Sequence, residues 1–138
     1  MFKEYYKRIS GDKESVGLVY KSHLDDGDFL KQLSYARKVD LILGHTTKGV
    51  HKDELEMLLG QYQIKKVGSQ GQNKSFLLAM KFAQFEYLKR IIGRTPILLL
   101  DDIFDKLDAQ RVEQIVKIVS SGEFGQIFIT DTNRTNLD

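Results

Sequence analysis

Two short, continuously apolar segments constrain the fold more than any other feature of this 138-residue chain. They are Pro96 to Leu100 and Gln126 to Thr130, and unbroken apolar runs of this length are typical of strands covered on both faces. Apolar residues recur at helical spacing between them, at Val112, Ile115, Val116 and Val119. A strand, a helix and a second strand in this order predict a right-handed parallel crossover, so we expect the C-terminal half to be α/β.

A helix, a strand and a second helix are predicted for the first part of the chain. Residues 1–8 have the pattern of a frayed helix end, and alternation from Ser15 to Leu24 indicates a strand with one buried face. From Asp28 to Leu43 apolar residues recur at helical spacing, with lysine and arginine on the opposite side. This segment is expected to be an amphipathic helix with a basic face.

A hairpin and a long helix are predicted for the middle of the chain. Leu55, Met57 and Leu59 occupy every second position of an expected strand, and Ile64 to Val67 is expected to return as the second strand after a turn at Gly60 to Gln63. From Gln72 to Ile92 apolar residues cover almost the whole circumference of a helix. We therefore expect this helix to be central and buried on most sides.

Composition excludes several kinds of site. The chain has no cysteine, which rules out a disulfide framework, a cysteine-based zinc site and a thiol nucleophile. Lysine and arginine number 21 against 19 aspartates and glutamates, a net charge of +2, so any nucleic-acid-binding patch has to be local. No apolar run approaches the roughly 20 residues of a membrane helix and the start lacks a signal peptide, so we expect no membrane association and a cytoplasmic location.

The strand that begins near Pro96 ends in a pair of acids, Asp101 and Asp102. Ligands of parallel α/β sheets bind beyond the carboxyl ends of the strands, so both carboxylates are expected to point into a site. This is the Walker B arrangement, in which Asp101 would hold Mg²⁺ through water and Asp102 would orient or deprotonate an attacking water. The alternative is a cap on the following helix, and for Asp108 the two interpretations are equally favoured.

A small and flexible loop, Gly68 to Gln72, precedes the long helix. Free backbone N–H groups at such a helix start attract anions, Gly71 lets a phosphate approach the backbone, and Ser69 adds a hydroxyl donor. Taken alone, a loop of this composition is more often a simple helix cap. Its position one helix before the acid pair is what favours phosphate binding.

Three motifs, in this order along the chain, carry a family resemblance. The motifs are Ser69-Gln70-Gly71-Gln72, Asp101-Asp102 and Asp105-Lys106-Leu107-Asp108. They resemble the signature motif, Walker B and D-loop of ABC-type ATPases, and within that superfamily the Gly49 to Asp53 element and the Gln126 to Thr130 strand resemble RecF, a DNA-repair family. The resemblance runs from about Leu41 to the end, and residues 1–40 match less specifically.

The resemblance implies the C-terminal half of an ABC/SMC-type P-loop NTPase head, with residues 54–138 as an ATPase half-domain and 1–53 as part of a DNA-binding lobe. It implies an ATP-driven clamp whose two heads dimerise around two nucleotides, with ATP and Mg²⁺ as cofactors. The signature residues Ser69 to Gln72 would act in trans on the other subunit's γ-phosphate, and Asp101 and Asp102 would serve the chain's own nucleotide. The D-loop would cross the dimer interface.

The resemblance also implies a role in recombinational repair and replication restart. The expected partners are single-stranded or gapped DNA and proteins resembling RecO and RecR. Candidates for contacting DNA phosphates are Arg37, Lys38, Lys48, His51 and Lys52. The three histidines lack the spacing of metal ligands and favour solvated roles, and the alternative for His51 is a place near DNA or nucleotide.

Two positions depart from the pattern of many ABC-type relatives. Asp102 stands where transporters have glutamate, which suggests slow hydrolysis suited to a switch. Thr130-Asp131-Thr132 stands where a histidine often senses the γ-phosphate, so Thr130 or Asp131 would take that role.

No Walker A motif occurs in the sequence, so the chain is not expected to bind ATP well alone, and whether it acts as an enzyme is open. We expect a truncated form, a fragmentary reading frame or one half of a split head. Two alternatives stay open: a non-catalytic DNA-binding or interaction module with an ATPase-like shape, and half of another ABC/SMC-type head.

Overall fold

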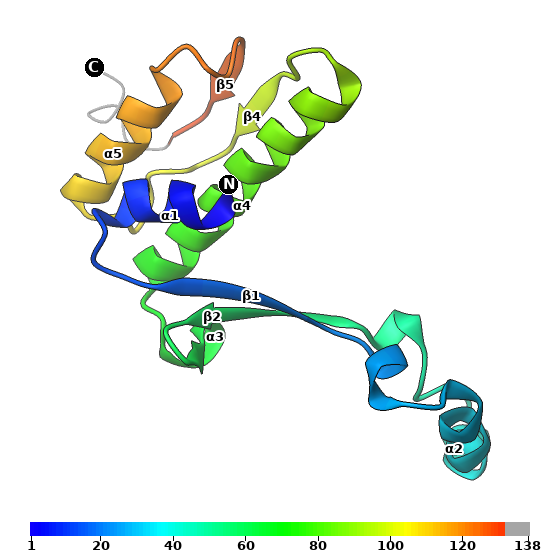
Figure 1. The fold of residues 1–138 in the computed structure, drawn as a ribbon. Coiled ribbons are helices and arrows are strands. Elements are labelled where there is room, and N and C mark those ends of the chain that lie inside the picture. Colours follow the sequence, from blue (N-terminus) through cyan, green and yellow to red (C-terminus); the bar gives the residue numbers. More distant parts are fainter. Residues whose placement is uncertain (132–138) are drawn as a thin grey trace. The chain divides into compact units, whose positions relative to one another are not determined.

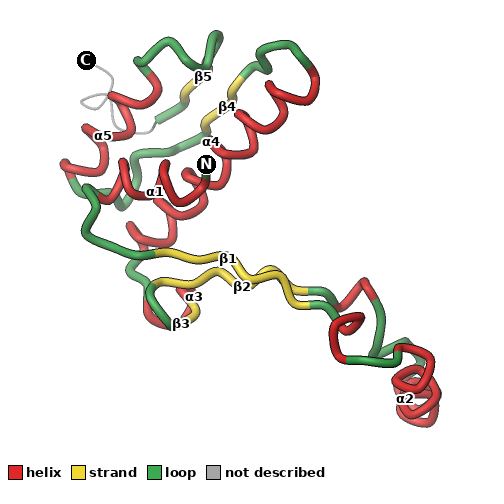
Figure 2. Tube along the Cα trace, in the orientation of Figure 1, coloured by secondary structure: helices red, strands yellow, loops and turns green. Residues whose placement is uncertain are grey.

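The computed structural model describes residues 1–131, and the chain divides by internal contacts into two compact units. The first unit contains residues 1–17 and the chain from Leu59 onward, and the second contains residues 18–58. Figure 1 shows the elements in chain order and Figure 2 shows the same trace by secondary structure. The elements are α1 (Phe2–Ser10), β1 (Val16–Lys21), η1 (His23–Asp26), α2 (Phe29–Leu43), η2 (Val50–Lys52), β2 (Glu54–Leu59), β3 (Tyr62–Gln63), α3 (Ile64–Val67), α4 (Gln70–Ile92), β4 (Leu98–Leu100), α5 (Ala109–Val119) and β5 (Ile127–Ile129).

The core of the first unit is aromatic and is built around α4, against which α1 packs (Figure 1). Tyr5 of α1 lies with its ring 5.5 Å from that of Phe82 of α4, and Phe82 lies 5.1 Å from Phe124. Tyr6 and Ile9 of α1 are fully buried. The prediction of a frayed end for residues 1–8 was therefore wrong, because aromatic side chains anchor this helix in the core.

The long helix α4 begins two residues earlier than predicted, at Gln70, because Ser69 caps it. Gly93 ends it in the left-handed conformation that glycine adopts readily, with φ of 68°. Its buried residues are Ser75, Phe76, Leu78, Ala79, Phe82 and Phe85. Leu77 and Ile91 are exposed, so the expectation of burial on most sides was wrong and the core covers one side only.

The predicted parallel strand pair is confirmed, with Leu98 beside Ile127, Leu99 beside Phe128 and Leu100 beside Ile129. Helix α5 connects the two strands, and its buried residues are Ile115 and Ile118. Burial on both faces of β4 was wrongly predicted, since Leu98 and Leu100 are buried while Leu99 is 68% exposed. One face of this sheet is therefore covered by the described chain.

The second unit consists of most of the paired strands β1 and β2, with η1, α2 and η2. Helix α2 is confirmed, with Asp28 accepting a hydrogen bond from Lys31 N at its start and Gly44 at its end. None of its residues is buried, although an amphipathic helix was expected. The one buried side chain of β1 is Val16, at the end that belongs to the first unit, so the expectation of a buried strand face was also wrong.

The predicted hairpin is present in a shorter form. Strand β2 turns at Gly60 and returns as β3, in a three-stranded sheet with the order β1-β2-β3. Ile64 to Val67, expected as the returning strand, is the helical turn α3. The reason is that Ile64 is buried and its carbonyl oxygen accepts from Gly68 N at 2.7 Å, which closes a helical turn.

Candidate functional site

The turn from Ser69 to Gln72 forms a reciprocal cap at the start of α4. Ser69 Oγ accepts from Gln72 N at 3.1 Å, and Gln72 Oε1 accepts from Ser69 N at 2.7 Å. The capping interpretation is therefore what the structure shows for these two side chains. Ser69 and Gln70 are exposed, and a hydroxyl that accepts one hydrogen bond keeps its own O–H to donate. Capping and phosphate binding are compatible at this turn.

Gly71 brings the turn directly against the loop after the acid pair. A Cβ atom at Gly71 would lie 3.1 Å from the carbonyl oxygen of Lys106, which is tighter than ordinary packing allows. Lys106 itself has a φ of 61°, a left-handed conformation that costs free energy in a residue with a side chain. Two of the predicted motifs are thus in contact within one unit.

The acid pair lies where β4 and β5 end, as the sequence predicts. Asp101 is exposed and accepts a hydrogen bond from the Thr130 hydroxyl. Asp102 N donates to the Thr130 carbonyl oxygen at 3.0 Å, and Thr130 N donates to Leu100 O at 2.9 Å. The structure therefore brings the predicted Walker B acids and the predicted switch residue Thr130 together, whereas Thr132 lies outside the described residues.

Asp102 has a φ of 47°, so its backbone is in the left-handed region. The amine of Lys74, from α4, donates to the Asp102 carbonyl oxygen and holds this turn. Lys74 and Lys81 also line a pocket between α4 and β4 that includes Asp101. Sequence reasoning missed both lysines, although their spacing of seven places them on one side of α4.

The oxygen atoms at this edge suit a hard cation held mainly by other ligands. Asp101 and Thr130 supply a carboxylate and a hydroxyl, and Mg²⁺ sites commonly use one or two carboxylates with water and phosphate oxygens. Within residues 1–131 no group of three or more histidines, aspartates or glutamates could hold a metal alone. The residues present fit Mg²⁺ bound together with a nucleotide.

The predicted D-loop, Asp105 to Asp108, leads into α5. Asp108 Oδ1 accepts from Arg111 N at 2.8 Å, and Asp108 Oδ2 accepts from Arg111 Nε at 3.1 Å. Asp108 is therefore the N-cap of α5, one of the two roles that the sequence left open. Asp105 forms an exposed ion pair with Lys106 at 3.7 Å.

A partly buried ion pair that sequence reasoning missed lies beside these motifs. Arg111 Nη2 donates to Glu14 Oε1 at 2.6 Å, and Glu14 also accepts from Tyr6. Burial alone would raise the pKa of Glu14, but hydrogen bonds from Tyr6 and Gln72 and the charge of Arg111 lower it below its ordinary value. Burial likewise opposes the charge of Arg111, yet Glu14 raises the pKa of that guanidinium. Glu14 and Arg111 are thus stabilised as a charged pair.

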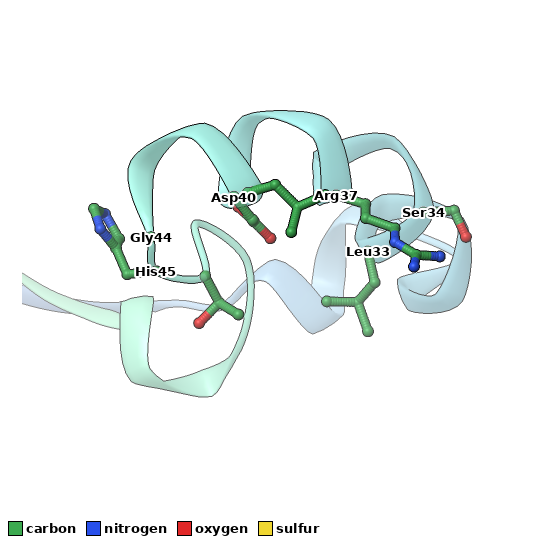
Figure 3. A pocket seen from close by; sticks show the side chains of 8 residues that line it. Leu33, Ser34, Arg37, Asp40, Gly44 and His45 are labelled. Atoms are coloured by element: carbon green, nitrogen blue, oxygen red, sulfur yellow. The ribbon is translucent and has the colours of Figure 1, made fainter.

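The candidate DNA-contacting residues all lie in the second unit. They are Arg37, Lys38, Lys48, His51 and Lys52. Arg37 lines a pocket beside α2 together with Asp40 and His45 (Figure 3). Asp40 accepts from both the backbone N and the hydroxyl of Thr47, at 2.9 and 2.6 Å, which lowers the pKa of its carboxyl and orders the loop after α2.

Comparison with known proteins finds RecF proteins that match the whole chain. No family model matches the chain. It is 60% identical over 138 residues to the DNA replication and repair protein RecF of Bacteroides thetaiotaomicron, covering all of this chain and 37% of that relative. The chain is similar to RecF along its entire length. RecF of Parabacteroides distasonis is also 60% identical, again over the whole chain and 38% of its own length. The resemblance predicted from the motifs is confirmed.

The fold is that of RecF as well. A solved structure of the recombination mediator protein RecF, described as RecF-ATPrS in the RecFOR pathway, superposes with a TM-score of 0.72 at 24% identity. The superposition includes 96% of this chain and 38% of the RecF-ATPrS chain. A RecF-ATP structure superposes with a TM-score of 0.70. The chain therefore spans well under half of the RecF proteins it matches, in their C-terminal portion. The expected α/β fold, with parallel strands flanked by helices, is confirmed.

The domain division predicted for a RecF-like chain stays a prediction, and the structure adds its own division by contacts. The first unit holds all three predicted ATPase motifs, and the second holds the candidate DNA-contacting residues. Among residues 1–131, no helix combines the length and apolar character that crossing a membrane requires.

Proposed function

We propose that this chain supplies the signature, Walker B and D-loop elements of a RecF-like, ATP-dependent DNA-binding protein of replication and repair. The observation that carries the proposal is the meeting of Asp101, Asp102 and Thr130 at the end of a parallel strand pair, in a chain 60% identical to RecF. These polar groups lie at the carboxyl ends of the strands, which is where α/β folds bind ligands. Hydrolysis requires the Walker A loop, which this sequence does not contain.

In this proposal the acid pair serves the nucleotide bound to the same head. Mg²⁺, when bound with the nucleotide, would offset the negative charge of the phosphates. Asp101 would hold that cation through water while Thr130 fixes the carboxylate by its hydrogen bond. Asp102 would orient the attacking water, with Thr130 or Asp131 sensing the γ-phosphate.

The turn from Ser69 to Gln72 would act on the nucleotide of a second subunit, so that ATP closes a homodimer. The start of α4 presents backbone N–H groups and the positive end of a helix of 23 residues, and Ser69 offers its hydroxyl. The Asp105 to Asp108 loop touches this turn and would cross the same interface. Dimerisation is thus proposed to depend on both loops.

DNA binding is proposed for the second unit. The exposed cations Arg37, Lys38 and Lys52 suit contacts with phosphates, which give affinity without reading sequence. Single-stranded or gapped DNA and proteins resembling RecO and RecR are the proposed partners, in a cytoplasmic setting. The structural relatives are described as belonging to a RecFOR pathway, which supports this choice of partners.

The test is an ATPase measurement on a chimera in which this chain replaces the matching part of RecF from Bacteroides thetaiotaomicron. Asp101→Asn removes the charge proposed to hold Mg²⁺ and should lower the rate by about a hundredfold or more, the scale of losing one main electrostatic contact. Glu113→Gln, which breaks an exposed ion pair with Lys117, is the matched control and should leave the rate unchanged. Equal rates for Asp101→Asn and the unsubstituted chimera would remove the magnesium role.

A non-catalytic DNA-binding module is the second candidate function. The observation favouring it is that the candidate DNA-contacting residues occupy a compact unit that contains none of the ATPase motifs. This function predicts salt-dependent DNA binding by the chain alone, with no change when ATP and the rest of a RecF head are added. Tighter binding with ATP would favour the ATPase proposal instead.

A further inference from the structure

Arg111 uses its whole guanidinium group to join the D-loop to other parts of the first unit. Its Nε donates to Asp108 at 3.1 Å, its Nη1 donates to Ser75 Oγ at 3.0 Å, and its Nη2 donates to Glu14 at 2.6 Å. The side chains of Arg111 and Glu14 are only 12% and 17% exposed. A planar fork with all three nitrogens engaged fixes the directions of its partners.

Two of those partners, Glu14 and Ser75, are also hydrogen-bonded to the signature turn. Glu14 Oε1 accepts from Gln72 Nε2 at 3.0 Å, and the same Gln72 side chain caps Ser69 N at 2.7 Å. Ser75 Oγ donates to the carbonyl oxygen of Gly71 at 2.8 Å. Two separate hydrogen-bonded paths therefore run from Arg111 to the turn between Ser69 and Gln72.

A direct contact between the two loops completes the arrangement. The Lys106 carbonyl oxygen and the Leu107 side chain are the atoms that a Cβ at Gly71 would meet, at 3.1 and 3.9 Å. A shift of one loop would therefore displace the other or break the hydrogen bonds that join them. Neither Glu14 nor Arg111 belongs to any of the predicted motifs.

We propose that Glu14 and Arg111 are positioning residues that hold the signature turn and the D-loop as one mechanical unit, so that both loops reach a nucleotide on a second subunit together. The nucleotide part of this inference rests on the proposed function. The linkage between the loops rests on the distances alone. Glu14 binds the signature turn, Arg111 binds the D-loop, and the ion pair between Glu14 and Arg111 connects the two loops.

Amide hydrogen exchange on the 138-residue chain tests the linkage without ATP. The two reporters are Gln72 N, bonded to Ser69, and Arg111 N, bonded to Asp108. Glu14→Gln removes the charge that Arg111 binds without touching the D-loop itself, and it should speed exchange at Arg111 N. Arg111→Lys keeps the charge but loses the fork, and it should speed exchange at Gln72 N. We expect increases on the order of tenfold, the effect of losing one charged hydrogen bond.

Ile115→Val is the matched control for stability. Ile115 is fully buried in α5, so losing a methyl group destabilises the same unit without touching the ion pair. In this variant, amide exchange at the two reporters should change by the same factor as amide exchange in the middle of α4. Increases confined to the loop nearest each substitution, or equal to those in Ile115→Val, would overturn the linkage.

ATP-dependent dimerisation of the chimera with Bacteroides thetaiotaomicron RecF tests the consequence. Glu14→Gln and Arg111→Lys should weaken the ATP-bound dimer and lower kcat by about tenfold each, with KM for ATP within about twofold, since a mispositioned loop affects the step made in trans. Ile115→Val should match the unsubstituted chimera. Dimerisation equal to that control would overturn the positioning role. A chimera that never dimerises with ATP would contradict the proposed function, and the exchange measurement alone would then decide the linkage.

Discussion

The two units of this chain are ordered by different forces. The first unit buries a cluster of aromatic rings, whereas no side chain of residues 18–58 is buried. Order in the second unit comes from polar contacts at the surface, such as the ion pair at 2.8 Å between the exposed Lys21 and the partly covered Glu56, and the exposed hydrogen bond between Tyr20 and Asp53. Exposed pairs of this kind contribute little free energy, so the difference should appear as a difference in local stability.

Truncation of a core ring should produce the largest effect and the sharpest contrast. Phe82 is fully buried between Tyr5 and Phe124, so Phe82→Ala should lower the free energy of unfolding by about 3–5 kcal/mol. Ile42→Ala, in the second unit, removes a side chain that is 84% exposed and should change it by less than about 0.5 kcal/mol. Urea unfolding of both variants measures the contrast, and similar losses would show that the second unit has a core of its own.

The ion pair between Glu14 and Arg111 should make the stability of the first unit depend on pH in the acidic range. Glu14 has a pKa below its ordinary 4.5, so its contribution is present above that value and is lost as the pH falls through the folded-state pKa. Glu14→Gln should cost about 2 kcal/mol near neutral pH, where a charged hydrogen-bond partner is removed. It should also flatten the decline in stability below pH 4.5. Thermal unfolding of Glu14→Gln and of the unsubstituted chain would be compared between pH 3 and 7. An equally steep loss of stability at low pH in both proteins would contradict this assignment.

Alanine substitution of two glycines, one in each unit, should lower stability for different reasons. Gly71→Ala places a Cβ against Lys106 O, and the strain of overpacking should cost about 1–3 kcal/mol despite the better helix propensity of alanine. Gly44→Ala meets no atom within 4 Å, but its φ of 71° should cost about 1–2 kcal/mol. Asparagine tolerates a left-handed backbone, so Gly44→Asn should recover much of that loss, whereas Gly71→Asn should recover none. Chemical denaturation of the two Gly71 variants, and amide exchange in α2 for the two Gly44 variants, separate the two causes.

How much of this the sequence could predict depends on whether the cause is local. The parallel strand pair, the limits of α2 and the end of α4 follow from periodicity and capping residues, which lie within a few positions of one another. Burial was overestimated for Leu99 and for α2, because apolar periodicity indicates which faces suit burial and not whether a partner surface lies within the chain. Glu14 and Arg111 are 97 positions apart, and nothing in a single sequence pairs such residues.

Within the candidate site the same distinction holds. The acid pair was found because an apolar strand directly precedes it, and Ser69 because it precedes a helix. The contact between Gly71 and Lys106, and the bond from Lys74 to Asp102, depend on how α4 packs against the end of β4. Such contacts are tertiary and become visible only in the folded chain.

The smallest expected effect concerns the polar contacts of the second unit. Asp53 has a lowered pKa because Tyr20 donates to it, and this bond ties η2 to β1. Asp53→Asn should leave the thermal unfolding of the whole chain unchanged, since the aromatic core of the first unit dominates that transition. It should speed amide exchange along β1 and β2 while leaving α4 unaffected. Exchange that also rises in α4 would mean that the two units unfold together, and the contrast between a core-stabilised and a surface-stabilised unit would have to be abandoned.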